Sequence, residues 1–343
     1  MRGITRRLTA LLLALSLLTG LLTVTAAAEE SAGTGYVKDS LVLQLDANNN
    51  TGTGTHDASA TLWVNLADPN KGTVDVSGFT WGKDEANGSY YLDMTKGGYL
   101  KLPDKVRQAI GGDAFTIEFL MDGYNGSPAD NIRNIMAVTG DDTWISSVTS
   151  PTATPNDNFV LFQNDSKGNN SGKFCFRTCY GTDPWTKVNT GSMDYCKIDQ
   201  SKISGTTNTL TFRVNGQSHW YTDGIDGGTV ATNGGNRIGV DGFKVDGKWQ
   251  TERKPQVIFG TNTDVLEKRE AFSAKVRAIR VYAAELTAEQ AAQNAAADKA
   301  AYHTPYVDPK YAAVPEGYAT NGLVLFLDAL KNTKTGHDST AAA

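Results

Sequence analysis

The segment DANNNTGTGTHD carries four oxygen-bearing side chains at spacings that suit a calcium ion. They occupy its first, third, fifth and twelfth positions: Asp46, Asn48, Asn50 and Asp57. Calcium prefers carboxylate and amide oxygens, and an EF-hand loop of about twelve residues supplies ligands from such positions. The segment departs from that loop because its sixth residue is Thr51 and its twelfth is Asp rather than Glu. Two interpretations stay open: a structural Ca²⁺ site, or a loop in which Asp46 bonds its own backbone.

Paired carboxylates are the second candidate for chemistry, because retaining glycoside hydrolysis uses two of them about 5 Å apart. The segment FTIEFLMDG carries Glu118 and Asp122, four residues apart. On an extended strand this spacing separates them by roughly 13 Å, which suits neither stereochemical outcome of hydrolysis. We interpret Glu118 as an outward-facing polar residue of an alternating strand. The sequence therefore predicts no catalytic residue.

Short strands are the elements that must position these groups. In FTIEFLM, Phe115, Ile117 and Phe119 alternate with polar residues, and TLTFRVNG shows the same period of two. This pattern is typical of a sheet with one buried face. The Asn215-Gly216 pair that follows is a strong hairpin signal, because both residues tolerate positive φ. Residues 36–282 therefore predict an all-β, two-sheet sandwich.

One short helix is expected after these strands. Thr287 and Gln290 have the spacing of a capping box, and an Ala-rich segment continues to about residue 301. Three prolines then predict an extended linker over residues 304–316.

The first residues have the pattern of a secretory signal. Three arginines precede a dense apolar run, and small residues at Ala26 and Ala28 suit a signal peptidase. We predict cleavage after Ala28, so that residues 1–28 are a signal peptide and the rest is secreted; an uncleaved membrane anchor is the alternative. No membrane insertion is expected once the signal is cleaved.

The charge balance excludes some classes of partner. The chain has a formal net charge of −5, and its Lys and Arg residues form no block. This argues against nucleic acid and anionic membrane surfaces as partners. Three cysteines, Cys175, Cys179 and Cys196, are too few for a disulfide scaffold, and their pairing stays open.

The end of the chain repeats its beginning. Aligning Gly35 with Gly317 keeps Gly-Tyr, Leu-Val-Leu and Asp-Ala in register, and one deletion aligns His56-Asp57 with His337-Asp338. We interpret residues 317–343 as the truncated start of a second copy of the domain. A segment of this length cannot bury a core by itself.

Three segments resemble a known family. They are LVLQLDANNNTGTGTHDASATLWVNLADPNKGTVDVSGFTWG, GGYLKLPDKVRQAIGGDAFTIEFLMDG and, the best match, FSAKVRAIRVYAAELTAEQAAQN. Residues 35–303 thereby resemble a bacterial laminin-G-like domain of the concanavalin A-like lectin/glucanase superfamily. The resemblance implies a jelly-roll sandwich of two antiparallel sheets that binds glycans or proteins outside the cell.

Glycan binding needs aromatic faces beside polar groups. Four aromatic residues lie in loop-like polar segments and are the candidate ligand contacts: Tyr124, Trp144, Trp185 and Trp249. Packing over the end of the sandwich is the alternative role for each.

These observations together predict a secreted, non-catalytic binding module at the cell surface. Its expected partner is an extracellular polysaccharide or a glycoprotein, with Ca²⁺ as an optional structural ion and no required cofactor. The alternatives are a glycoside hydrolase of the glucanase type and a structural spacer domain without a ligand.

Overall fold

The computed structural model describes most of the predicted domain. The described residues are 35–68, 70, 72–124, 133–139, 159–164, 173–178, 192–199, 202–232, 237–238, 240, 243–245, 248–250, 254–261 and 273–303. The predicted signal peptide, linker and second copy lie outside them, so those boundaries stay predictions.

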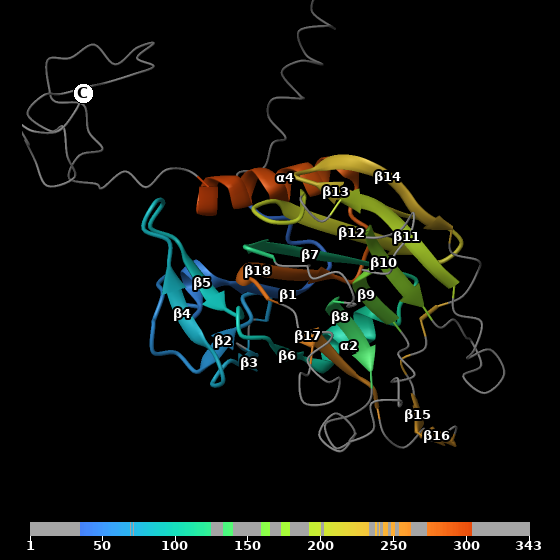
Figure 1. Cartoon of the computed structure of the whole chain (residues 1–343), viewed down its shortest axis with the longest axis horizontal. Coiled ribbons are helices and arrows are strands. Elements are labelled where there is room, and N and C mark those ends of the chain that lie inside the picture. Colours follow the sequence, from blue (N-terminus) through green and yellow to red (C-terminus); the bar gives the residue numbers. More distant parts are fainter. Residues whose placement is uncertain are drawn as a thin grey trace, which may run out of the picture.

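One antiparallel sheet contains eight of the described strands. Its order is β14-β13-β12-β7-β18-β5-β4, and β1 also pairs with β18 (Figure 1). The bounds are β1 Leu41–Asp46, β4 Thr80–Lys83, β5 Tyr90–Asp93, β7 Ala114–Asp122, β12 Thr207–Arg213, β13 Gln217–Thr222, β14 Ile225–Thr232 and β18 Lys275–Tyr282. The predicted hairpin is confirmed, since Asn215 joins β12 to β13 with φ 58°.

The second sheet is antiparallel and has the order β11-β10-β9-β8-β17-β6 within the described part of the chain. Its bounds are β6 Gly98–Leu102, β8 Arg133–Thr139, β9 Phe159–Asn164, β10 Lys173–Thr178, β11 Ser192–Asp199 and β17 Gln256–Thr261. Two small ribbons pair β2 (Leu62–Val64) with β3 (Thr73–Asp75), and β15 (Phe243–Val245) with β16 (Lys248–Gln250). The predicted all-β sandwich is confirmed.

The core lies between the two sheets. Phe119 of β7 meets Phe259 of β17 with ring centroids 6.2 Å apart, and Phe115 and Ile117 are also fully buried. Each such side chain contributes about 1.5–3 kcal/mol through burial. The alternation in FTIEFLM therefore predicted the inner face of β7 correctly. A short helix that the sequence did not predict, α2 (Asp104–Ile110), adds buried Val106 to the core.

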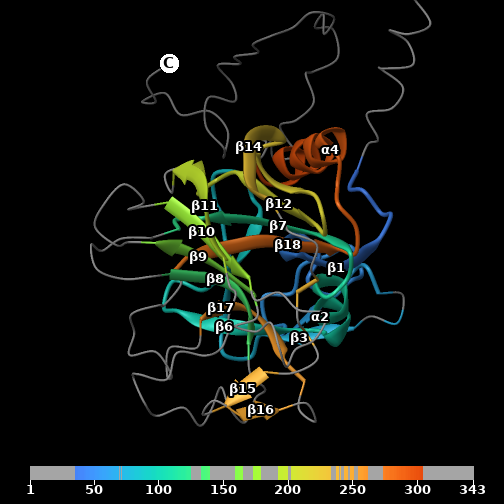
Figure 2. The same cartoon turned by 90° about the vertical axis from the view of Figure 1, so that its right-hand side faces the viewer.

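Helix α4 (Ala288–Asp298) covers the other face of the eight-stranded sheet (Figure 2). Its predicted capping box is present, because the Thr287 hydroxyl accepts from the Gln290 N–H and the Gln290 side chain accepts from the Thr287 N–H. A π-helical turn, η3 (Lys299–His303), continues the helix. Among the described residues, no helix combines the length and the apolar composition that spanning a bilayer requires.

Helix α4 adds to one prediction. Glu118 lies on the outer face of β7, as expected, but it is 0% exposed because helix α4 covers that face. Its Oε2 accepts from Arg280 Nε at 2.8 Å and from Asn294 Nδ2 at 2.8 Å, and its Oε1 accepts from the Thr209 hydroxyl at 2.8 Å. Glu118 is thus a structural residue that ties the sheet to the helix.

Candidate functional site

Asp46 holds the predicted calcium loop together through hydrogen bonds. Its Oδ1 accepts from the backbone N–H of Asn48 at 2.8 Å and from the Tyr302 hydroxyl at 2.5 Å. It thereby caps the short 3₁₀ helix η1 (Ala47–Asn49). This is the bonding expected of the second interpretation, a loop closed by its own side chain.

The other three predicted calcium ligands also bond within the protein. The Asn48 side chain bonds the Tyr90 N–H at 2.9 Å and the Ala301 carbonyl at 3.2 Å. The Asn50 amide bonds both backbone groups of Asp57, each at 2.8 Å, while the Asp57 carboxylate accepts from Ser59. Across the described residues, no group of three His, Cys, Asp or Glu side chains could hold a metal ion. Calcium binding stays a prediction.

Of the four predicted ligand aromatics, the structure describes the side chain of Tyr124. Tyr124 is half-buried and packs against the main core. Trp249 lies in β16 and pairs with Lys244 of β15. Trp144 and Trp185 lie outside the described residues. Their contact with a ligand stays a prediction.

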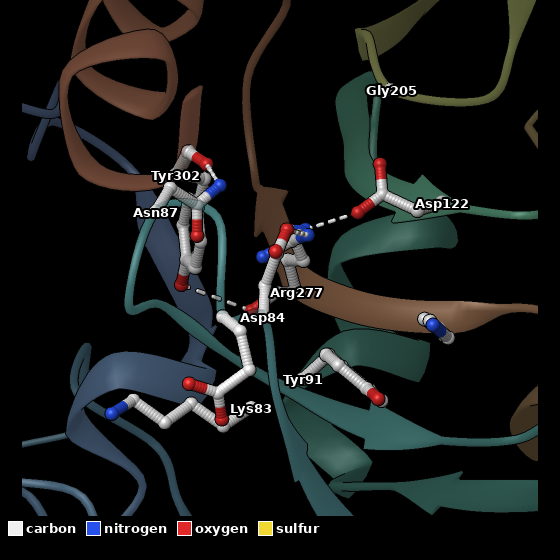
Figure 3. Close-up of a pocket in the computed structure, with 10 residues that line it drawn as sticks. Lys83, Asp84, Asn87, Tyr91, Asp122, Gly205, Arg277 and Tyr302 are labelled. Atoms are coloured by element: carbon white, nitrogen blue, oxygen red, sulfur yellow. Dashed lines mark hydrogen bonds and ion pairs between the residues drawn. The ribbon is translucent and has the colours of Figure 1, made fainter. Parts of the chain in front are cut away.

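A polar cleft of about 560 Å³ opens at one end of the eight-stranded sheet (Figure 3). The β4–β5 hairpin, the end of β7, the start of β18 and the turn after α4 all contribute to it. The lining residues are Lys83, Asp84, Glu85, Asn87, Tyr91, Asp122, Gly205, Lys275, Arg277 and Tyr302. Because it gathers acids, bases and a ring in one hollow, we take this cleft as the candidate site.

A β-bulge aims Arg277 into the cleft. Val276 pairs with Met121 and Ala278 pairs with the preceding residue, Leu120, so Arg277 is the extra residue of β18. Bulges of this kind redirect a side chain where a strand meets a functional site. The Arg277 side chain is only 4% exposed, so its charge must be compensated locally.

Two carboxylates and a hydroxyl provide that compensation. Arg277 Nη2 bonds Asp84 Oδ2 at 2.7 Å, Nε bonds Asp122 Oδ2, and Nη1 bonds the Ser89 hydroxyl. The second oxygen of Asp122 lies on the side of Gly205 (Figure 3) and accepts no hydrogen bond from the described residues. That oxygen is an acceptor available to a ligand.

The electrostatics of Asp84 fit an ion pair. Burial alone would raise the pKa of its carboxyl, but hydrogen bonds from Arg277 and from the Ala86 N–H lower it below the ordinary value, helped by the charges of Arg277 and Lys275. Asp84 therefore stays ionised at neutral pH.

Tyr91 supplies the aromatic surface of the cleft. It pairs with Gly82 across β4 and β5, and a Cβ on Gly82 would overlap the Tyr91 ring. The glycine thus lets the ring lie across the neighbouring strand. On the ring, Lys275 Nζ stands 4.8 Å from the centroid, within the range of a cation–π contact.

The turn after α4 forms the back of the cleft. Tyr302 is 1% exposed, and its hydroxyl bonds both Asp46 and the carbonyl of Arg277. Asn87 donates to the Tyr302 carbonyl. The predicted calcium loop is therefore linked to the cleft through Tyr302, although it does not line it.

Comparison with known proteins assigns no family. No protein-family model and no curated protein matches the chain. Among solved structures, the receptor-binding domain of botulinum neurotoxin C/D mosaic serotype has a TM-score of 0.41 and 11% identity, covering 76% of this chain and 52% of that one. The binding domain of botulinum neurotoxin DC in complex with SialylT has a TM-score of 0.39 and 13% identity, covering 77% of this chain and 52% of that one.

A Trypanosoma rangeli sialidase in complex with the inhibitor DANA gives a TM-score of 0.38 and 12% identity, covering 74% of this chain and 32% of that one. This chain thus spans about half of the toxin domains and about a third of the sialidase. At these scores the likeness carries no functional argument. The sandwich implied by the laminin-G resemblance is observed, while the family itself stays a prediction.

Proposed function

We propose that this domain is an extracellular, non-catalytic module that binds carbohydrate, free or on a glycoprotein, in the polar cleft. The observation that carries the proposal is the combination of Tyr91 with the available oxygen of Asp122 in one hollow of about 560 Å³. Sugar sites pair an aromatic face with a few fixed polar groups. The signal-like residues 1–28 support the extracellular setting.

Cleavage of the sugar is the main alternative, since Asp84 and Asp122 meet at one guanidinium. A glycosidase needs one carboxyl with a raised pKa to protonate the leaving group. The pKa of Asp84 is lowered instead, and Asp122 is bound to the same Arg277. Asp84 and Asp122 are therefore suited to holding Arg277 in place and to accepting hydrogen bonds from sugar hydroxyls, rather than to acid catalysis.

A glycan array followed by calorimetry tests the proposal on the full chain. We expect binding to at least one glycan, and a loss of about tenfold or more (about 1.5 kcal/mol) in Tyr91→Ala and in Asp122→Asn. The first removes the ring, and the second turns the ligand-facing acceptor into an NH2 donor because the remaining oxygen faces Arg277. Lys96→Gln is the matched control, an exposed substitution outside the cleft. Circular dichroism verifies the fold of each variant.

Two results would overturn the proposal. An absence of binding to every glycan would favour the spacer alternative. Release of reducing ends from a bound polysaccharide, lost in Asp84→Asn, would favour the hydrolase.

A further inference from the structure

Lys275 is a half-buried cation with no anionic partner among the described residues. Its ammonium contacts the Tyr91 ring at 4.8 Å, and it forms no ion pair or hydrogen bond within the part of the chain that the structure describes. A lysine carries three donors, and an aromatic face does not satisfy them as an anion does. Those donors therefore remain for something that enters the cleft.

The nearby acids are already bonded to other groups. Asp84 receives Arg277 on one oxygen and the Ala86 N–H on the other. Asp93, which pairs with Lys275 across β5 and β18, receives the backbone and hydroxyl of Thr95 at 2.9 and 2.5 Å. The charge of Lys275 helps to lower the pKa of both carboxyls, yet neither carboxylate lies within ion-pair distance of the Lys275 ammonium.

A second amine stands at the rim of the same cleft. Lys83 is exposed and forms no ion pair with any described residue. Asp84 and one oxygen of Asp122 are thus bonded to Arg277, and Glu85, the third acid that lines the cleft, is exposed. Neither Lys83 nor Lys275 forms an ion pair with a described residue, so a ligand that enters the cleft meets two amines and one carboxylate oxygen of Asp122 that can bind it.

We propose that the ligand of the cleft is an acidic sugar, whose anionic group binds Lys275 while a hydroxyl donates to Asp122. The inference rests on the proposed function and narrows its ligand class. Lys83 adds attraction at the rim. The anionic group is a uronate carboxylate or a sulfate ester, since both accept charge-assisted hydrogen bonds from an ammonium.

Calorimetry on the full chain with three matched oligosaccharides tests this inference. They are an oligogalacturonate, its carboxyl-reduced neutral counterpart and a sulfated galactan fragment. We expect the wild type to bind one anionic ligand about tenfold or more tightly than the neutral one, as one charge-assisted hydrogen bond allows. Raising the salt from about 0.05 M to about 0.5 M should shrink that preference.

Variants separate the inference from the function on which it rests. Lys275→Gln should lose the preference for the anionic sugar over its neutral counterpart, Lys275→Arg should retain most of that preference, and Lys96→Gln should match the wild type. Equal binding of neutral and anionic sugars, or an unchanged preference in Lys275→Gln, overturns the inference and leaves the proposed function standing. Failure to bind any of these or any arrayed glycan overturns both.

Discussion

Arg280 and Glu118 form an ion pair that is sealed between the eight-stranded sheet and α4. Nε lies 2.8 Å from Oε2, and the two side chains are 1% and 0% exposed. The other edge of the guanidinium bonds Asp298 of α4 at 2.9 and 2.5 Å. Burial alone would lower the pKa of Arg280, but the charges of Asp298 and Glu118 raise the pKa of the guanidinium well above its ordinary value. The helix is therefore held to the sheet by charge as well as by packing.

Substitution of this arginine should destabilise the fold strongly. Arg280→Met leaves two buried carboxylates without a counter-charge, and breaking a buried pair costs about 3–5 kcal/mol. Urea unfolding measures the change. The control is Arg213→Met. Arg213 pairs with Glu285 at 3.5 Å, but the Arg213 side chain is 65% exposed, so we expect the free energy of unfolding to fall by about 1 kcal/mol or less. Equal losses in both variants would contradict the buried role.

The N-terminus of α4 offers a smaller, graded test. Thr287→Ala removes the hydroxyl that accepts from the Gln290 N–H, and loss of such a cap costs about 0.5–2 kcal/mol. Thr287→Ser keeps the hydroxyl and should stay within a few tenths of a kcal/mol of the wild type. Thermal unfolding distinguishes the two, and an equal loss in both would show that the cap bond is unimportant.

Strand β7 shows which part of this fold the sequence can predict. Alternation identified Phe115 and Ile117 as core residues, because the inner face of a sheet is encoded locally with a period of two. The same alternation placed Glu118 on the outer face of β7, where it lies, but it did not show that this face is buried. The burial of the outer face depends on where α4 docks, about 170 residues later in the chain, and periodicity carries no information about that contact.

The cleft was harder to predict, and Arg277 shows why. Regular alternation along β18 would put Val276 and Ala278 on one face, yet the buried core residues are Val276 and then Ile279. That spacing of three is the signature of the bulge, and it is recognisable only once β18 is known to be a strand. Asp84, Tyr91 and Arg277 come from separate elements, so only the folded topology brings them together.

Replacing the glycine under Tyr91 should damage the cleft without touching a polar group. In Gly82→Ala the new Cβ overlaps the Tyr91 ring, and overpacking of this kind costs about 1–3 kcal/mol. We expect a lower melting temperature and weaker glycan binding. Gly78→Ala is the control, since a Cβ there meets nothing within 4 Å. Normal binding by Gly82→Ala would argue against a role for the Tyr91 ring.

Chelation tests the calcium interpretation of the loop. Its four side chains already bond to the protein, so we expect the melting temperature to be the same with and without a chelator. A bound ion would stabilise the folded state by mass action. A fall in melting temperature with chelator that added Ca²⁺ reverses, and that Asp57→Asn abolishes, would instead establish a calcium site.

Acid should loosen the loop through His56. Its Nδ1 bonds the Ala47 carbonyl at 2.7 Å, its ring stacks on Tyr90 at 3.7 Å, and its buried Nε2 has no hydrogen-bond partner in the described structure. Burial lowers the pKa of His56, against the opposing effects of the Ala47 carbonyl and the charge of Asp57. The unfolded chain, with an ordinary histidine pKa of about 6.5, therefore binds the proton more readily than the folded chain.

The sign of the effect follows from that difference. The stability that depends on neutral His56 is fully present above about pH 6.5 and is lost progressively as the pH falls below that value, toward the lower pKa of the folded state. Urea unfolding across this range should show a steeper acid loss in the wild type than in His56→Phe, which keeps an aromatic ring against Tyr90 but cannot be protonated. The difference between the two curves isolates His56, because every other titrating group is shared. Parallel curves would mean that the imidazole accepts its second proton without cost, and hence that Nε2 has access to an acceptor or to water in solution.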